Sequence, residues 1–182
     1  MSKNECNNIT EVYNEINKDF NSNSKKMKID LIYAFNGTGK TRISRMFAEN
    51  LEDNVLCFNA MFQDEFTWVN DYHFLTLNKS SWIARLIRNQ GLENTIEDNF
   101  RMFCGNVIEP SMDLENDIIE FSAKTIDGYD YDIKVSKAEE SIFIWTIFYT
   151  FMDTMFYELK EEQNDRSTDI FDNIKYIIID DP

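Results

Sequence analysis

The sequence predicts an α/β fold in which a mostly parallel sheet is flanked by helices and carries an antiparallel hairpin insert. Short strand-like runs at residues 28–33 and 55–58 alternate with stretches of helical spacing. Residues 174–179 (IKYIII) form a continuous apolar run, which is typical of a strand covered on both faces. Two further apolar runs flank an Asp-Gly pair at residues 127–128, a dipeptide favoured in tight hairpin turns.

Composition excludes several classes of protein. The chain has 182 residues and is 43% hydrophobic, enough for one domain with a real core. Its net charge of −15 disfavours direct binding of nucleic acid by this segment. Three widely spaced cysteines indicate reduced thiols rather than a disulfide framework, and the single histidine, His73, excludes multi-histidine metal sites. No leader is visible and the apolar stretch 142–152 is too short to span a bilayer, so we expect a soluble, cytoplasmic protein without membrane contact.

Helices and domain limits follow from the spacing of apolar residues. The hairpin strands are expected at 118–126 and 129–135, and a charged loop at 161–169. We expect an N-terminal helical and loop segment over residues 1–27 and one domain over residues 28–182. Helical spacing occurs at residues 12–20, 43–51, 82–87, 92–103 and 138–160.

The strongest motif is the loop AFNGTGKT at residues 34–41, which stands between a predicted strand and a predicted helix. A phosphate chain requires inward-facing backbone amides, glycines that permit close approach, and a helix N-terminus behind them. Gly37 and Gly39 provide the glycines, Lys40 a charge for the β- and γ-phosphates, and Thr41 a hydroxyl for Mg²⁺. The motif therefore predicts a phosphate-binding loop.

Ala34 replaces the first glycine of the usual pattern, and a small side chain is tolerated there if φ stays negative. The alternative interpretation is a glycine turn that caps an ordinary helix. The residues predicted to bind the nucleotide in this loop are Asn36, Gly37, Thr38, Gly39, Lys40 and Thr41.

An acidic pair follows the last predicted strand. A carboxylate at the end of a buried strand beside a phosphate loop holds Mg²⁺, and a second one can orient the attacking water. We assign the first role to Asp180 and the second to Asp181. Without the upstream loop, the same pair would be read as a helix cap or a turn.

Two weaker motifs add candidate residues. The segment VSKAEE at 135–140 stands before the long helix, where Ser136 and Glu139 could contact the γ-phosphate bound by a second subunit. The same Ser-x-x-Glu pattern is also a capping box, which is the alternative. Gln63, after the second predicted strand, is a candidate for reaching Mg²⁺ and the catalytic water, although solvated loop polarity explains it equally well.

At these residues the chain resembles the N-terminal NTPase region of PrrC-type anticodon nucleases. The resemblance rests on residues 31–44 (LIYAFNGTGKTRIS), 58–68, 133–153 and 171–182. It implies a P-loop NTPase of ABC-ATPase-like type, in which VSKAEE takes the place of the Leu-Ser-Gly-Gly-Gln signature. The family shares Ala34 but has glycine at the position of Ala138, which puts tight closure of the signature in doubt.

The resemblance also implies a function. ATP or GTP with Mg²⁺ would control a C-terminal ribonuclease that cuts a lysine tRNA in its anticodon loop as an antiviral response. Expected partners are a second copy in a head-to-tail homo-oligomer, a type I restriction-modification complex, and tRNA through the C-terminal domain. The nuclease residues lie downstream of this sequence, so we expect an N-terminal piece, with NTPase activity predicted by motif and ribonuclease activity only in the full-length protein.

Two alternatives stay open at the level of sequence. One is an ABC/SMC-like ATPase of DNA repair or of another phage-defence system with a different effector. The other is a nucleotide-binding fragment that dimerises but does not hydrolyse.

Overall fold

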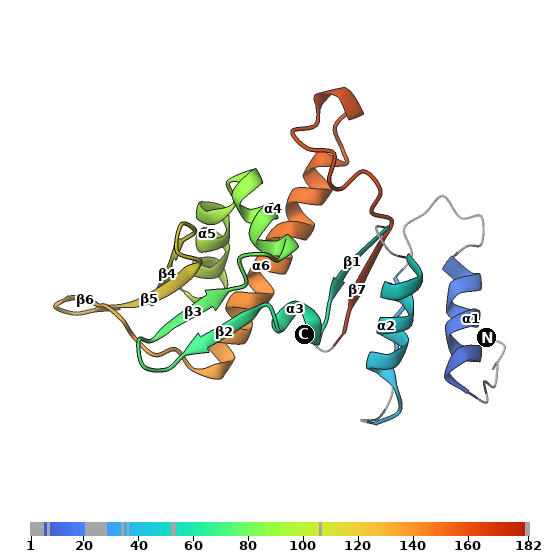
Figure 1. Cartoon of the computed structure of the whole chain (residues 1–182), viewed down its shortest axis with the longest axis horizontal. Helices are drawn as coiled ribbons and strands as arrows, with labels where there is room; N and C mark the ends of the chain where they lie inside the picture. Colours follow the sequence, from blue (N-terminus) through green and yellow to red (C-terminus); the bar gives the residue numbers. More distant parts are fainter. Residues whose placement is uncertain are drawn as a thin grey trace. The chain divides into compact units, whose positions relative to one another are not determined.

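The computed structural model divides the chain into two compact units (Figure 1). The terminal unit comprises Met1–Asn59 together with Ile174–Pro182, and the central unit comprises Ala60–Asn173. The residues that the structure describes are 6, 8–20, 29–33, 35, 37–51, 54–105 and 107–180. The predicted boundary between residues 27 and 28 lies outside them, so it stays a prediction.

In the terminal unit, two parallel strands pair and two helices pack beside them. Strand β1 (Val55–Phe58) pairs with β7 (Tyr176–Ile179), in a register that joins Val55 to Tyr176 and Phe58 to Ile179. Helix α2 (Lys40–Leu51) packs against both strands, and α1 (Ile9–Phe20) packs against α2. The rings of Tyr13 and Phe47 lie 4.6 Å apart between these helices. The spacing of apolar residues predicted both helices and both strands correctly.

The strand predicted at residues 28–33 is not formed. Its described part, residues 29–33, belongs to no strand, and Ile29, Leu31 and Tyr33 are 84%, 77% and 88% exposed. An apolar run becomes a strand only where a neighbouring strand accepts its backbone hydrogen bonds. Among the described residues, the parallel sheet is limited to β1 and β7, so the mostly parallel sheet that the sequence predicts is not evident.

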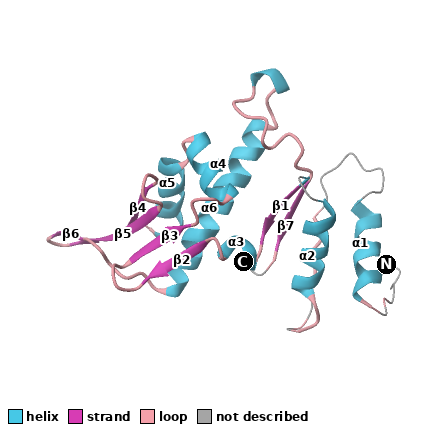
Figure 2. Ribbon diagram, in the orientation of Figure 1, coloured by secondary structure: helices cyan, strands magenta, loops and turns pink. Residues whose placement is uncertain are grey.

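The central unit is built on an antiparallel sheet (Figure 2). Among the described residues this sheet has five strands in the order β2-β3-β5-β4, with β6 paired to β5. The strands are β2 (Phe66–Val69), β3 (Phe74–Leu77), β4 (Ile108–Asp113), β5 (Ile118–Thr125) and β6 (Gly128–Asp130). The helices are α3 (Ala60–Gln63), α4 (Trp82–Gln90), α5 (Glu93–Cys104), α6 (Lys137–Glu158) and the short 3₁₀ helix η2 (Gln163–Asp165).

One face of this sheet is closed by aromatic packing. Burial alternates along β5, where Ile119 and Phe121 are buried and their neighbours are more exposed, as expected for a strand with one covered face. The ring of Phe121 meets Phe100 of α5 and Phe143 of α6 edge to face at 6.1 and 5.3 Å. Figure 1 shows α5 and α6 along the sheet. The core of the central unit is therefore aromatic and lies between sheet and helices.

The predicted hairpin is present but shorter on its second side. Thr125 pairs with Gly128, whose φ of 135° suits glycine at the turn. The second strand ends at Asp130 instead of continuing to residue 135. Asp132 has a φ of 57°, a left-handed conformation that interrupts a strand. The sheet that carries the hairpin contains β2, β3 and β4, which the sequence did not predict.

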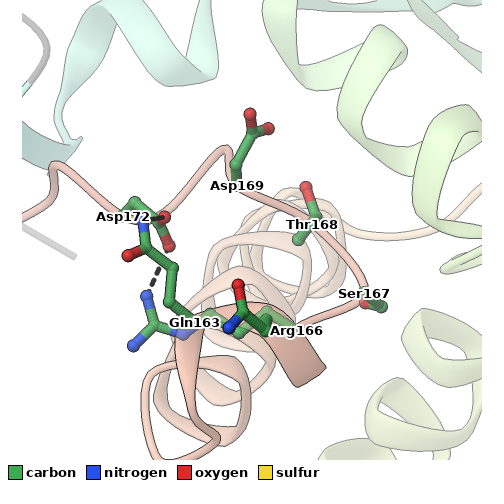
Figure 3. A pocket seen from close by; sticks show the side chains of 7 residues that line it. Gln163, Arg166, Ser167, Thr168, Asp169 and Asp172 are labelled. Atoms are coloured by element: carbon green, nitrogen blue, oxygen red, sulfur yellow. Dashed lines mark hydrogen bonds and ion pairs between the residues drawn. The ribbon is translucent and has the colours of Figure 1, made fainter.

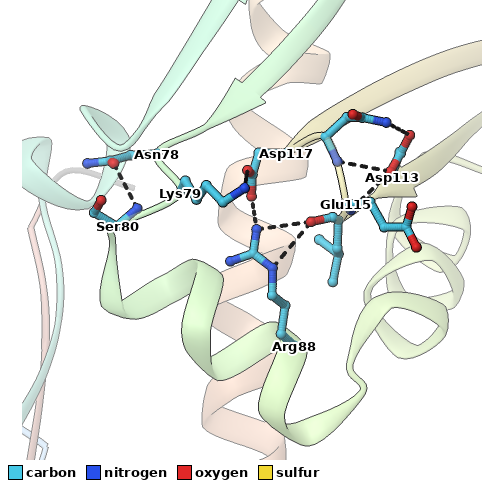
Figure 4. A network of polar contacts seen from close by, with 9 residues as sticks. Asn78, Lys79, Ser80, Arg88, Asp113, Glu115 and Asp117 are labelled. Atoms are coloured by element: carbon cyan, nitrogen blue, oxygen red, sulfur yellow. Dashed lines mark hydrogen bonds and ion pairs between the residues drawn. The ribbon is translucent and has the colours of Figure 1, made fainter.

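An ion-pair network fastens α4 to the turn between β4 and β5 (Figure 4). The Arg88 guanidinium pairs with the Asp117 carboxylate and donates to the Leu114 carbonyl oxygen from Nη2 at 3.0 Å and from Nε at 3.3 Å. The Lys79 ammonium lies 3.7 Å from the other carboxylate oxygen of Asp117. Because Asp117 is buried and has a φ of 59°, these cations stabilise a charge held in an unusual backbone conformation.

A polar hollow of about 510 Å³ follows α6 (Figure 3). Arg166 donates to Asp172 at 2.5 Å and Gln163 donates to the same carboxylate at 3.0 Å. Both interactions hold the loop onto itself, and they lower the pKa of Asp172. Of the helices in the described residues, none combines the length and apolar character that crossing a membrane requires.

Candidate functional site

In the glycine loop of the terminal unit, two donors share one acceptor, the carbonyl oxygen of Phe35. The backbone amide of Thr38 donates to the Phe35 oxygen at 3.3 Å, and the Thr38 hydroxyl donates to the same oxygen at 2.7 Å. Gly37 and Gly39 have φ values of 80° and 102°, which side chains rarely adopt. The two glycines therefore make possible the tight turn that leads into α2.

Helix α2 begins directly at the end of this loop, as the motif predicts. Lys40 is its first residue, and the Ile43 amide donates to the Gly39 oxygen at 3.0 Å as the first turn of the helix. The first amides of a helix have no partner within it, and its N-terminus favours anions. The Lys40 ammonium reaches back to the Phe35 oxygen at 3.4 Å, so its charge also lies at the loop.

Asp180 follows β7 at the carboxyl end of the parallel pair. Its amide donates to the Phe58 oxygen at 2.9 Å, which extends the ladder by one residue. The first acidic residue is thus held at a defined position in the same unit as the glycine loop. This is the edge of a parallel sheet where ligands bind in α/β proteins.

Cys57 of β1 lies within electrostatic reach of both Ser44 of α2 and Asp180. The pKa of the Cys57 thiol is raised to about 11, chiefly by burial; the hydroxyl of Ser44 opposes this rise, and the negative charge of Asp180 adds to it. The three side chains come from α2, β1 and the end of β7. Thr41 lies three residues before Ser44, so it shares that face of the helix.

The Ser44 hydroxyl is a buried polar group without a partner. Ser44 is 6% exposed, and within the described residues its oxygen makes no hydrogen bond of acceptable geometry, although the Cys57 thiol lies near it. Buried hydroxyls without a partner are rare in folded proteins, because losing water without replacement costs free energy. The Ser44 hydroxyl is therefore a buried polar atom whose described neighbour is the Cys57 thiol.

The described side chains suit Mg²⁺ if the phosphates of a nucleotide complete its shell. In the part of the chain that the structure describes, no three His, Cys, Asp or Glu residues are grouped to hold a metal ion alone. Mg²⁺ is usually held by one or two protein oxygens together with phosphates and water. Thr41 and Asp180, both in the terminal unit, carry a hydroxyl and a carboxylate of the kinds that such a shell uses.

The remaining candidates lie in the central unit or outside the described residues. Ser136 is the N-cap of α6, and its capping box with Glu139 is formed: the Glu139 amide donates to the Ser136 hydroxyl at 3.2 Å, and the Ser136 amide donates to the Glu139 carboxylate at 2.6 Å. Gln63 is the half-buried last residue of α3. Asn36 and Asp181 lie outside the described residues.

Asn59 directly follows β1, as Asp180 directly follows β7, and the sequence motifs did not single it out. Asn59 is 6% exposed, and its side-chain amide donates to the Cys57 sulfur at 3.3 Å. Its position in the sequence was the one available clue. A polar residue directly after a buried parallel strand lies at the same sheet edge as Asp180.

Comparison with known proteins shows homology to an anticodon nuclease. The chain is 33% identical over 196 aligned residues to a protein of Escherichia coli described as an anticodon nuclease. The alignment covers 92% of this chain and 50% of that protein, so the chain spans about half of its relative's length. No family model matches the chain, and no solved structure does. The relationship agrees with the anticodon-nuclease part of the resemblance; the assignment to an NTPase region stays a prediction.

Proposed function

We propose that this chain is the nucleotide-binding, regulatory part of an anticodon nuclease, controlled by ATP or GTP with Mg²⁺. The observation that carries the proposal is the loop of Gly37 and Gly39 leading into α2, in one unit with a carboxylate at the carboxyl end of β7. The homology to an anticodon nuclease supports the choice of effector. If the loop were only a glycine turn that caps a helix, no acidic residue such as Asp180 would be needed in the same unit.

The loop and α2 would bind the phosphates. The amides of residues 37–41 and the positive end of α2 attract the anion, while Lys40 exchanges the Phe35 oxygen for the β- and γ-phosphates. Thr41 and Asp180 would hold Mg²⁺, which neutralises phosphate charge when it is bound. Asp181, next in sequence, would position the attacking water.

Ser136 and Glu139 are proposed to act across a head-to-tail homo-oligomer. The capping box leaves the N-terminal amides of α6 beside Ser136, and a helix start of this kind favours the γ-phosphate of a second copy. Gln63 is proposed to reach the metal-bound water. The proposed roles of Ser136, Glu139 and Gln63 require that the two units of a chain come together and that two copies of the chain associate.

The tRNA would be cut by the other half of the protein. A net charge of −15 makes this half unsuited to RNA, so anticodon-loop recognition of a lysine tRNA is assigned to the downstream domain. By family resemblance, a type I restriction-modification complex is the proposed partner that keeps the nuclease silent.

Nucleotide binding without hydrolysis is a second candidate. The observation that favours it is the capping box, in which Ser136 and Glu139 already bond to each other's backbone. Ala138 also adds a side chain at the place where the family has glycine. ATP turnover by wild type and its loss in Asp181→Asn would exclude this candidate.

Thermal unfolding tests the proposed function. Wild type, Lys40→Ala and the control Lys18→Ala, an exposed lysine of α1, are melted with and without Mg-ATP and Mg-GTP. Nucleotide at about 100 times its Kd adds roughly 2.7 kcal/mol, worth several degrees in a domain of this size. We expect the shift in wild type and Lys18→Ala but not in Lys40→Ala. Cooperative unfolding of wild type without a shift would contradict the proposal.

A further inference from the structure

The negative charge of the chain is concentrated in the central unit. That unit carries 9 basic and 23 acidic side chains, and so −14 of the chain's net charge of −15. Such a charge repels the phosphates of nucleic acids and of anionic lipids, which disfavours both as partners for its surface. A protein that binds this unit is therefore expected to be basic where it makes contact.

One exposed surface of the central unit combines this charge with tyrosine rings. Tyr72, in the turn between β2 and β3, is 71% exposed, and Tyr129 of β6 and Tyr131 directly after it are 44% and 70% exposed. The rings of Tyr129 and Tyr131 stack at 6.1 Å, and the ring of Tyr72 stacks on Phe74 at 5.9 Å. Figure 1 shows the β5–β6 hairpin extending beyond α4, α5 and α6. We call the three exposed tyrosines the tyrosine patch.

Two hydrogen bonds join the two segments that carry the tyrosine patch. The His73 ring donates from Nδ1 to the Asp132 carbonyl oxygen at 2.9 Å, and the Lys134 ammonium donates to Oδ1 of Asn70 at 2.9 Å. These bonds link the turn between β2 and β3 to the segment that follows β6. The patch is therefore one surface built from segments about sixty residues apart, and its rings need little reordering to bind a partner.

Carboxylates accompany the rings along both segments. Asp71, Asp130 and Asp132 are exposed neighbours of the three tyrosines in the sequence, and within the described residues none of them forms an ion pair. The nearest basic side chain in the register is Lys124, opposite Tyr129. A guanidinium group stacks on the face of an aromatic ring and pairs with carboxylates. Rings and carboxylates together thus suit arginine.

We infer that the tyrosine patch binds an arginine-rich segment of a partner protein, with guanidinium groups stacked on Tyr72 and Tyr131 and paired with Asp130 and Asp132. The inference uses no residue of the nucleotide site, so it stands or fails independently of the proposed function. A chain of charge −15 attracts any basic peptide, so the test must separate the effect of the rings from that of the charge.

Substitutions that keep the charge isolate the rings. An octa-arginine peptide with a fluorescent label is titrated with the 182-residue chain at physiological ionic strength, and binding is followed by fluorescence anisotropy. Tyr131→Leu keeps an apolar side chain but loses the ring, so it should bind about fivefold more weakly than wild type, and adding Tyr72→Leu should weaken binding further. Tyr157→Leu, at a 66% exposed tyrosine of α6, is the control and should match wild type.

Tyr131→Trp protects the test against misfolding. Tryptophan is the strongest cation–π partner, so this variant should bind at least as tightly as wild type, a result that damage to the fold would not give. Asp130→Asn combined with Asp132→Asn should weaken binding more than Asp153→Asn combined with Glu162→Gln, which removes the same charge from exposed positions elsewhere in the unit.

Three results would overturn the inference. The first is that wild type does not bind the peptide. The second is that Tyr131→Leu and Tyr157→Leu bind it as well as wild type does, because general attraction to the acidic chain would then explain the binding. The third is that Tyr131→Leu leaves peptide affinity unchanged but abolishes self-association in sedimentation velocity, which would make a second copy of the chain the occupant of the patch.

Discussion

A Cβ atom placed on Gly39 would lie 2.5 Å from Cδ1 of Ile9, so the side chain of Ile9 in α1 packs directly against this glycine. Gly39 also has a φ of 102°, a conformation that disfavours any side chain. The N-terminal helix therefore belongs to the structure around the loop. Gly37 differs in having open space around it, although its φ of 80° is equally left-handed.

These two glycines give a matched pair of substitutions. Gly37→Ala should lower the free energy of unfolding by about 1–2 kcal/mol from the backbone conformation alone. Gly39→Ala should cost about 1 kcal/mol more, because the Ile9 side chain must move away from the new methyl group. Combining Gly39→Ala with Ile9→Ala should remove that excess in urea unfolding followed by circular dichroism. Equal costs for Gly37→Ala and Gly39→Ala would show that Ile9 does not pack tightly against Gly39.

Capping and catalysis at Ser136 can be separated by comparison with Ser81. Ser81 caps α4 in the same unit, where its hydroxyl accepts from the Ala84 amide at 3.0 Å. Ser81→Ala and Ser136→Ala should each lower stability by about 1 kcal/mol, the usual value of an N-cap. Only Ser136→Ala should also reduce ATP turnover by more than its loss of folded protein explains. Turnover lowered equally in both variants would leave Ser136 as a cap and nothing more.

The Arg88–Asp117 ion pair should contribute measurably to the central unit. Their side chains are 28% and 11% exposed, so Arg88→Ala leaves a mostly buried carboxylate whose remaining ion pair among the described residues is the 3.7 Å contact to Lys79. We expect a loss of about 2 kcal/mol in urea unfolding, less than for a fully buried pair. Arg85→Ala, an exposed arginine on the same helix, should change stability by less than about 0.5 kcal/mol.

Neutralising the partner tests whether the lost charge pairing is the cause. Asp117→Asn retains a side chain that tolerates the left-handed φ of 59° and removes the charge. Adding it to Arg88→Ala should recover part of the stability. A double variant that is less stable than Arg88→Ala would indicate that packing, and not charge, dominates.

Local pattern predicted the five longer helices, because a helix closes its hydrogen bonds within its own residues, and it also located the two parallel strands. The apolar runs at 28–33 and 174–179 look alike in sequence, yet only the second forms a strand. The difference lies in the partner: β7 pairs with β1, and within the described residues no strand pairs with residues 29–33. Pairing partners are distant in sequence, so a single run cannot reveal them.

Local sequence also failed to predict three strands of the antiparallel sheet, β2, β3 and β4. Strands β2 and β3 have four residues each, too few for a clear alternation, and His73 between them has a left-handed φ of 55°. Strand β4 contains Pro110, which normally argues against a strand. Of the candidate site, the glycine loop and Asp180 were predictable from motif and order, whereas Asn59 required the register of β1 and β7.

Acid should weaken the central unit through Glu158, the last residue of α6. Glu158 is 6% exposed and accepts hydrogen bonds from the Ser167 hydroxyl at 2.6 Å and the Ser167 amide at 2.7 Å. Against the opposing effect of burial, these donors lower the pKa of Glu158 below its ordinary 4.5, the hydroxyl having the largest effect. The unfolded chain therefore takes up the proton first as the pH falls. The stabilisation is complete above pH 4.5 and is lost as the pH falls through the lower pKa of the folded state.

Ser167→Ala should remove part of this pH dependence. Without the hydroxyl the folded pKa rises toward 4.5, so the variant should be less stable than wild type at pH 7 and approach it at acidic pH. Ser111→Ala, an exposed serine of β4, should follow wild type throughout. Asp172, whose pKa is lowered chiefly by Arg166, titrates in the same direction in all three proteins and cancels in the comparison. Urea unfolding between pH 3 and 7 measures the difference in stability between Ser167→Ala and wild type. If this difference does not change with pH, the Ser167 hydroxyl does not alter the protonation of Glu158.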